Sequence, residues 1–398
     1  MLDDRFSRDA ANFRPSAIRA FARIINDPGI ISFAGGVPNP ETFPAEAIAT
    51  IATKVLRDRR EIALQYGPTR GLPRLCESVS ALCRQRGINA DVGSILMTTG
   101  SQQALDLLAH TLLDPGDVVV VELPTYIGGT ASFYARSAEV VGVPQDDDGV
   151  ITSALAETAR RLRDEGKRLR IFYTIPNFQN PSGRLMTQQR RAEVRALAEE
   201  YHFLVIEDDP YGELLYVDAD TTPMCAGSRF PPHILYLGSF SKVLAPGLRC
   251  GWIAAAGDLI EKLEIAKQAG DLCSAMLDQS IIDEFCAQGL LPPQIEKVRA
   301  FYREKRAVLL HSLEEHFSGR ATWTAAEGGL FTFLTFLDDI DTASRVQDAV
   351  AAGVAYIPGA PFFVDGGGRN TMRLTFAKEG DERIREGVAR LAGVFASA

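Results

Sequence analysis

Between about residues 95 and 255, short apolar runs alternate with amphipathic stretches that have the periodicity of a helix. An apolar run bounded by turn residues is typical of a buried strand, and apolar residues three and four apart are typical of a helix. Strands that alternate with helices form a mostly parallel sheet covered on both faces. The expected strands are 117–121, 170–175, 203–206, 234–237 and 251–255, and the expected helices are 101–113 and 187–201.

The rest of the chain predicts a second, smaller unit, and 398 residues are enough for two or three units. After Gly257 the pattern becomes helical, and a charged stretch at 294–316 predicts a long helix that connects two domains. Further strands are expected at 329–335, 354–357 and 371–376, and helices at 342–352 and 382–396. We therefore expect an N-terminal arm beside the small domain at 1–45, a large α/β domain at 46–290 and a small α+β domain at 291–398.

Charge and hydropathy limit which partners and which cellular location the sequence predicts. The net charge of -9 gives no electrostatic signature of a nucleic-acid or anionic-lipid partner. The longest uncharged stretch, 349–364, is short and broken by glycine and proline, so no membrane span is expected. The first residues lack the apolar segment of a secretory signal, and the six cysteines form no CxxC pair. We expect a cytoplasmic protein with free thiols.

Lys242 stands between an apolar strand and a turn, in YLGSFSKVLAPGLRCGW. A partly desolvated lysine has a lowered pKa and can form a Schiff base with a carbonyl group. A surface lysine at a strand end is the alternative for Lys242 alone. The neighbouring Ser239, Ser241 and Arg249 favour an anionic phosphate nearby, because arginine binds phosphate through its planar fork.

Polar residues follow several of the other expected strands. In TTGSQQALDLL, Ser101 begins a helix whose free N–H groups could bind an anion, although an ordinary Ser N-cap is the alternative. Asn180 follows the strand at 170–175, where open α/β sheets bind ligands. Asp208 lies among three acidic residues that end the strand at 203–206, and Tyr211 follows. A metal is the poorer interpretation of these carboxylates, since no histidine is near.

Together these residues are the parts that an aromatic aldehyde phosphate requires, and pyridoxal phosphate fits them. The lysine would bind the aldehyde, and the hydroxyls and guanidinium would bind the phosphate. A carboxylate would keep the pyridine nitrogen protonated, which makes the ring an electron sink. Tyr126, in VVELPTYIGG, could stack on the ring or could only anchor its own loop.

The whole chain resembles the fold type I pyridoxal-phosphate aminotransferases of class I/II. It is most similar to the branch of the 2-aminoadipate (LysN-type) and kynurenine aminotransferases. The matching strings are LQYGPTRG, TTGSQQALDLL, NPSG, EDDPYGELLY, GSFSKVLAPGLR and NTMRL. The resemblance implies a large domain with a mostly parallel, seven-stranded sheet flanked by helices, and a smaller C-terminal α+β domain.

The resemblance also implies roles for individual residues. Lys242 would carry the cofactor and Asp208 would bind its pyridine nitrogen. The other cofactor contacts would be Tyr126, Asn180, Tyr211, Ser101, Gln102, Ser239, Ser241 and Arg249, with Tyr66 reaching the phosphate of the neighbouring subunit in a homodimer. The substrate contacts would be Arg373, Gly36, Asn180 and Arg19, the last of which could equally be a helix-surface residue. There are two departures: Cys76, where the family often has arginine, is expected to alter a surface or interface contact, and NPSG for the commoner NPTG keeps a hydroxyl and should leave the cofactor site intact.

The expected reaction moves an amino group from an L-amino acid to a 2-oxo acid, 2-oxoglutarate being the expected acceptor, by a ping-pong mechanism. Lys242 would also move the α-proton. A pyridoxal-phosphate lyase or decarboxylase remains an alternative, because the same residues serve those reactions. A non-enzymatic sensor fused to a DNA-binding domain is disfavoured, because the resemblance begins by about residue 13. The sequence leaves the amino donor open among 2-aminoadipate, aromatic and aliphatic types.

Overall fold

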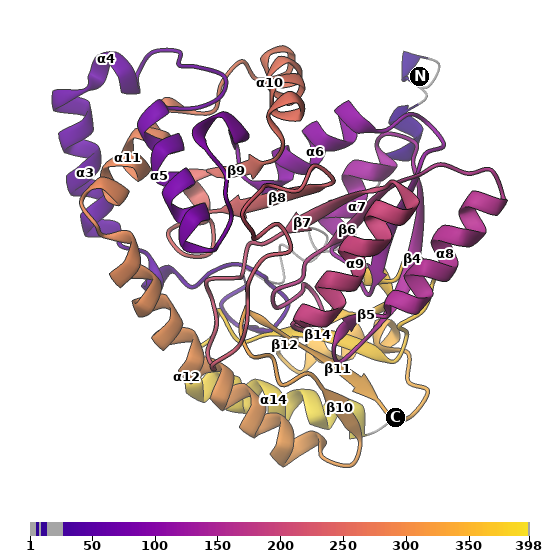
Figure 1. Ribbon diagram of the computed structural model, residues 1–398. Helices are drawn as coiled ribbons and strands as arrows, with labels where there is room; N and C mark the ends of the chain where they lie inside the picture. Colours follow the sequence, from indigo (N-terminus) through magenta and orange to yellow (C-terminus); the bar gives the residue numbers. More distant parts are fainter. Residues whose placement is uncertain (1–4, 8, 14–26, 397–398) are drawn as a thin grey trace.

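A computed structural model describes residues 5–7, 9–13 and 27–396 of the chain (Figure 1). Its centre is an eight-stranded sheet with the strand order β2-β9-β8-β7-β6-β3-β4-β5. The strands are β2 (Ile95–Thr98), β3 (Val118–Leu123), β4 (Glu139–Asp146), β5 (Gly149–Val150), β6 (Leu169–Thr174), β7 (Leu204–Asp208), β8 (Ile234–Ser239) and β9 (Gly251–Ala254). The two-residue β5 is a hairpin partner of β4 and adds to the seven strands that the resemblance implies.

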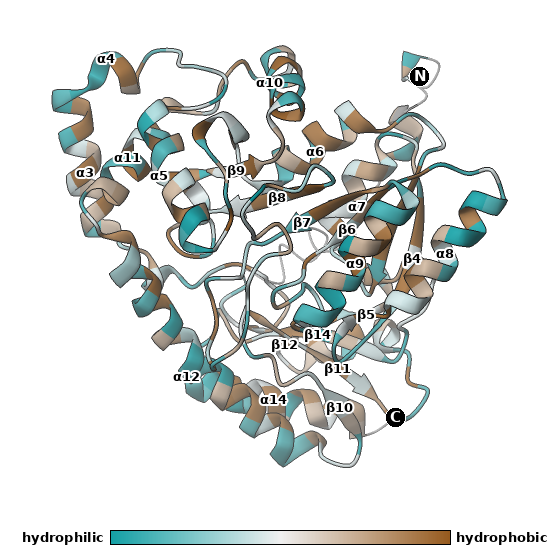
Figure 2. Ribbon diagram, in the orientation of Figure 1, coloured by the Kyte–Doolittle hydropathy of each residue, from teal (hydrophilic) through white to brown (hydrophobic). Residues whose placement is uncertain are grey.

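Parallel pairing dominates the middle of this sheet. Strands β4, β3, β6, β7 and β8 run parallel to one another, whereas β9 is antiparallel to both β8 and β2. Every residue of β8 is buried, and β3 and β7 have one partly exposed residue each. A sheet buried on both faces needs helices on both sides. Figure 2 accordingly shows brown, apolar strands inside and teal, polar residues on the surrounding helices.

The helices confirm the alternation expected from the sequence. Helix α6 packs against α7 and α10, and α8 packs against α9. The described helices that precede Leu291 in the chain are α3 (Ala45–Asp58), α4 (Arg60–Ala63), α5 (Pro73–Gln85), α6 (Ser101–Leu112), α7 (Ile127–Tyr134), α8 (Thr152–Asp164), α9 (Gln188–Tyr201), α10 (Gly257–Gly270) and α11 (Met276–Ala287). Short 3-10 turns are η2 (Asp9–Asn12), η3 (Pro40–Thr42), η4 (Val92–Ser94) and η5 (Pro246–Leu248).

Helix α12 (Leu291–Phe317) runs from the large sheet to a second, four-stranded sheet, where it packs against α14 (Asp381–Ala396) (Figure 1). This antiparallel sheet has the order β10-β11-β14-β13. Its strands are β10 (Ala321–Trp323), β11 (Phe331–Phe336), β13 (Ile357–Pro358) and β14 (Thr371–Thr375). The remaining elements of this part are η6 (Thr342–Arg345), α13 (Val346–Ala351) and η7 (Ala360–Phe362).

The single strand expected at 354–357 is wrong, because the structure divides it between two sheets. Residues Val354–Ala355 form β12, which pairs in parallel with β1 (Ile31–Ser32) near the N-terminus. The next strand, β13, pairs instead with β14. A local pattern cannot show this division, since the choice of partner depends on a segment more than 300 residues away.

The structure also bears on the expected free thiols and on the question of membrane spans. All six cysteines are free thiols, as expected, and four of them are buried. Within the described ranges, no helix has both the length and the apolar character that a membrane crossing requires.

Candidate active site

The predicted site residues meet where the parallel strands end. Asp208 is the last residue of β7, and Ser239 is the last residue of its neighbour β8. Asn180 follows β6 on the other side of β7, and Lys242 follows β8. Because the carboxyl ends of parallel strands share one edge of a sheet, side chains far apart in the sequence come together here.

Lys242 directs its amine toward the N-terminal segment. Its Nζ donates a hydrogen bond to the Gly36 carbonyl oxygen at 3.1 Å and lies 5.9 Å from the centre of the Tyr211 ring. Desolvation of the amine, followed by repulsion from Arg373 and Arg249, lowers the pKa of Lys242 to about 8. An amine with this pKa is partly neutral near pH 7 to 8 and can act as a nucleophile or a base.

Asp208 is buried and only half satisfied. Its Oδ2 accepts a hydrogen bond from the Tyr173 hydroxyl at 2.9 Å, while Oδ1 is buried and has no hydrogen-bond partner among the described residues. Burial raises the pKa of Asp208 to about 7, although the bond from Tyr173 opposes this shift. A buried oxygen without a donor is costly, so this arrangement is suited to a ligand that brings an N–H group.

A cup for an anion forms where β2, β9 and β8 meet. Gly251 of β9 pairs with Thr98 of β2 on one side and with Ser239 of β8 on the other. Ser239 and Ser241 are in contact through their hydroxyls, at 2.9 Å. The Arg249 Nη2 donates to the Thr99 carbonyl oxygen at 3.2 Å. Hydroxyl groups and a guanidinium therefore lie beside the start of α6.

The start of α6 corrects one alternative from the sequence. Ser101 is the first helical residue rather than the N-cap, which is Gly100 with φ +78° and ψ +168°. The free N–H groups of this first turn remain available for an anion. A β-carbon on Gly100 would lie 2.7 Å from Nη2 of Arg249, so glycine is what allows the guanidinium to approach the helix.

Arg373 is buried at the junction of the two sheets. Its Nη1 donates to Asn180 Oδ1 at 2.9 Å, and its Nη2 donates to the Ala34 carbonyl oxygen at 2.7 Å. Its guanidinium lies 4.4 Å from the centre of the Phe331 ring and 5.2 Å from that of Phe362. Its Nε has no partner in the described part of the chain. Burial lowers the pKa of Arg373 to about 10, and the group stays charged at neutral pH. It can therefore bind a carboxylate.

Tyr126 is placed by the loop that leads into α7, and Gln102 in α6 lies against that helix. Tyr126 is the N-cap of α7, and its ring covers Gly128, where a β-carbon would lie 2.4 Å from Tyr126 Cζ. The Gln102 Nε2 donates to the Gly128 carbonyl oxygen at 2.9 Å and to the Ser132 hydroxyl at 3.1 Å. Gln102 thus ties α6 to α7, the helix that Tyr126 caps.

Two predicted residues are not joined to this cluster by the structure. Tyr66 lies after α4 with 78% of its surface exposed. Arg19 lies outside the described residues. Of the three acidic residues at the end of β7, Glu207 accepts from the backbone N–H groups of Met224 and Cys225, and Asp209 is paired with Arg86. Only Asp208 therefore has a free oxygen at this point.

Sequence reasoning missed three residues that support the site. Tyr173 binds Asp208 and Phe331 stacks on Arg373, but an aromatic residue within an expected strand is ordinarily a core residue. Lys267 is fully buried and donates to Asp271 at 2.6 Å and to Gln103 at 3.2 Å. The same Gln103 oxygen accepts from the Thr99 N–H, so Lys267 braces the turn before α6. The i, i+4 spacing of Lys267 and Asp271 was the only local signal.

Comparison with known proteins identifies the family. The family model "Aminotransferase class I and II" matches residues 30–391. The chain belongs to this family. Aromatic-amino-acid aminotransferase 1 of Thermococcus litoralis is 43% identical over 388 residues, which are 97% of this chain and 93% of the relative. The 2-aminoadipate transaminase of Thermus thermophilus is 38% identical over 390 residues, which are 98% and 96% of the two chains.

Solved structures agree with this family. A kynurenine aminotransferase of Pyrococcus horikoshii, solved in complex with PMP, has a TM-score of 0.95 at 39% identity, covering 100% of this chain and 98% of that one. LysN of Thermus thermophilus, an α-aminoadipate aminotransferase, has a TM-score of 0.91 at 36% identity, with 100% of both chains covered. This aminotransferase has fold type I and depends on pyridoxal phosphate.

The residues present fit this cofactor. The bare Oδ1 of Asp208 suits the N–H of a protonated pyridine ring. The open first turn of α6, with Arg249 and two serine hydroxyls beside it, suits a phosphate dianion. The amine of Lys242 suits an aldehyde.

Proposed function

We propose that this aminotransferase transfers the amino group of an L-amino acid of 2-aminoadipate, aromatic or aliphatic type to 2-oxoglutarate by a ping-pong mechanism. The observation that carries this proposal is the Lys242 amine, held at Gly36 with a pKa of about 8. Relatives named for aromatic amino acids, 2-aminoadipate and kynurenine support the range of donors.

Lys242 has two tasks in this proposal. Pyridoxal phosphate supplies an aldehyde that takes up the amino group and a ring that withdraws electrons from the α-carbon. The Lys242 amine would hold the aldehyde before substrate arrives and, when free, would accept the proton from the substrate α-carbon. Its lowered pKa supports the second task, because a protonated amine cannot accept that proton.

The other residues bind and orient. Asp208 Oδ1 would accept from the ring nitrogen, Asn180 and Tyr211 would hold the ring's phenolic oxygen, and Tyr126 would stack on the ring. The phosphate contacts in this proposal are Ser101, Gln102, Ser239, Ser241, Arg249 and Tyr66 of a neighbouring subunit.

Arg373 would bind the α-carboxylate of the substrate, next to Asn180 and the backbone of Gly36, and Arg19 would contact the substrate side chain. The fixed guanidinium of Arg373, held by Asn180 and Ala34 and stacked on Phe331, supports this role. Its position costs little entropy on binding, because the side chain is already ordered.

We further propose a cytoplasmic homodimer that serves amino-acid biosynthesis. Exposed apolar side chains at Ile62, Leu64 and Tyr66, around and after α4, support a subunit contact on this side. We also retain the division into 1–45, 46–290 and 291–398. The start of α12 at Leu291 supports the second boundary, and the pairing of β1 with β12 supports an N-terminal segment that belongs beside the small domain.

The absorbance spectrum of the protein with pyridoxal phosphate tests the proposal. We expect L-glutamate to remove the band of the lysine-bound cofactor and 2-oxoglutarate to restore it, and the Lys242→Ala variant to show neither the band nor turnover. The same assay with 2-aminoadipate, phenylalanine and leucine then ranks the donors. Release of ammonia or carbon dioxide in place of a 2-oxo acid would contradict amino transfer, and substantial turnover by Lys242→Ala would contradict the role of Lys242.

A further inference from the structure

We propose that Tyr173 is a positioning residue for Asp208: its hydroxyl holds one carboxylate oxygen so that the other faces the ring nitrogen of the cofactor. This inference rests on the proposed role of Asp208. Tyr173 and Asp208 lie on the adjacent parallel strands β6 and β7, and their contact at 2.9 Å is buried. The two oxygens of Asp208 therefore differ, one bonded and one bare.

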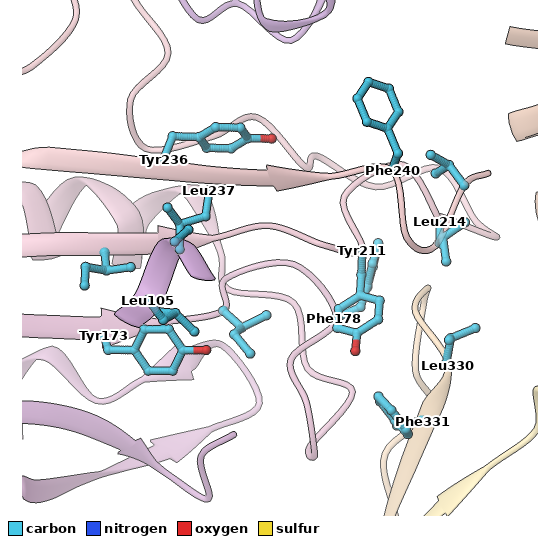
Figure 3. Packing of buried hydrophobic residues seen from close by; sticks show 14 of the residues in the cluster. Leu105, Tyr173, Phe178, Tyr211, Leu214, Tyr236, Leu237, Phe240, Leu330 and Phe331 are labelled. Carbon is cyan, nitrogen blue, oxygen red and sulfur yellow. The ribbon is translucent and has the colours of Figure 1, made fainter. Parts of the chain in front are cut away.

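The Tyr173 ring packs closely against α7. A β-carbon on Gly129 would lie 2.7 Å from Cε1 of Tyr173 and 2.8 Å from Cζ, so the ring occupies space that a glycine in α7 leaves open. Phe133, one turn further along α7, meets the ring edge to face with 5.6 Å between centres. Figure 3 shows the Tyr173 hydroxyl directed toward the carboxyl ends of the strands. Close packing against α7 at both points, together with the hydrogen bond to Asp208, holds the hydroxyl in a defined place.

The hydrogen bond also favours the charged form of Asp208. Burial, together with the neighbouring Asp209, raises the pKa of Asp208, and the Tyr173 bond is the contribution that lowers it. Burial and the charges of Asp208, Tyr126 and Glu122 raise the pKa of Tyr173 well above its usual range, so Tyr173 remains a donor. Removal of the hydroxyl would leave the carboxylate free to rotate and easier to protonate, and both changes weaken its contact with a pyridinium.

The test combines a substitution with a change of one cofactor atom. The apoprotein and its Tyr173→Phe variant are titrated with pyridoxal phosphate and with the 1-deaza analogue, in which C–H replaces the ring nitrogen. We expect Tyr173→Phe to bind pyridoxal phosphate about tenfold more weakly, since a hydrogen bond to a charged group is lost. The deaza analogue should lose less than about twofold, because it has no ring nitrogen for Asp208 to bind.

Tyr236→Phe is the matched control. Tyr236 is also buried, and its hydroxyl donates to Oδ2 of the adjacent Asp209 at 3.0 Å. Figure 3 shows its ring on the neighbouring part of the sheet with the hydroxyl pointing in the same direction as that of Tyr173. This variant should lose no more affinity for pyridoxal phosphate than for the analogue. Equal losses for both ligands in Tyr173→Phe, or no loss, would overturn the proposal.

A second variant guards against poor folding of the first. Gly129→Ala keeps the phenol but places a methyl group 3.0 Å or less from Cε1, Cζ and the hydroxyl oxygen of Tyr173, so the ring must move and its contact with Asp208 must change. The same selective loss for pyridoxal phosphate over its deaza analogue is expected, and a loss equal for both ligands would contradict the inference. Failure of the proposed function itself would appear differently, as absence of cofactor binding in the unmodified protein.

Discussion

The substitution Gly100→Ala should have two separate effects: it strains the backbone before α6, and it displaces Arg249 from the anion cup. Gly100 has φ +78° and ψ +168°, a region of backbone conformation that is almost exclusive to glycine. Its missing β-carbon also leaves room for Arg249, since the added carbon would lie 2.7 Å from Nη2. The exposed end of the Arg249 side chain can move to relieve that contact, and it would then lose its bond to the Thr99 carbonyl oxygen.

The two effects have different magnitudes and different observables. The backbone strain should cost about 1–3 kcal/mol of folding free energy. The displaced guanidinium should weaken a charge-assisted bond to phosphate worth about 2 kcal/mol. That loss corresponds to a roughly 30-fold higher dissociation constant for pyridoxal phosphate. Inorganic phosphate, used as a competitor in the same titration, should also bind more weakly.

The assay is a fluorescence titration of the apoprotein, with Gly319→Ala as the control. Gly319 also has a positive φ, +74°, but its β-carbon would meet nothing within 4 Å. Gly319→Ala should therefore lose stability and keep its affinity for the cofactor. The reasoning would be refuted if Gly100→Ala bound pyridoxal phosphate within about twofold of the unmodified protein, or if both variants were weakened alike.

Lys267→Met should lower the free energy of unfolding in urea by about 2 kcal/mol, because the hydrogen bonds of its buried amine to Asp271, Gln103 and Ser274 are lost. Lys262→Met, on the exposed side of α10, should change it by less than about 0.5 kcal/mol. Asp208→Asn should stabilise the apoprotein at pH 8 by up to about 4 kcal/mol and leave it unchanged at pH 4 in the same experiment. The pKa of Asp208 is raised to about 7, so the folded chain retains a proton that the unfolded chain loses between pH 4 and 7. Arg373→Lys should raise KM for the amino acid about 100-fold in initial-rate assays, since lysine lacks the planar fork; an unchanged KM would contradict the role of Arg373.

Much of the fold follows from local pattern. Buried parallel strands such as β3 and β8 appear as unbroken apolar runs, and the helices between them show their periodicity directly. The division of 354–357 between β12 and β13 could not be predicted, because β12 pairs with β1 at the other end of the chain. Strand pairing between distant segments leaves no signal in the window of residues around either strand.

The residues of the candidate site also fall into those that the sequence predicted and those that it did not. Lys242 and Arg249 could be found because a charged residue in an apolar or glycine-rich setting is unusual. Tyr173 and Phe331 could not, because an aromatic residue in a strand has the same appearance whether it packs in the core or supports a charged group. Lys267 was missed for a related reason: its neighbours in the sequence are those of a surface helix, yet it is completely buried.

The sequence alone determined the alternation of strands and helices, the family and the chemical types of the site residues, since these depend on local side-chain order. Only the tertiary structure decided which oxygen of Asp208 is bare, which glycine makes room for Arg249 and which carbonyl receives the Lys242 amine. Each of these depends on distances of a few ångströms between segments tens or hundreds of residues apart. Such distances are set by the packing of the whole sheet and its helices, and no single segment contains them.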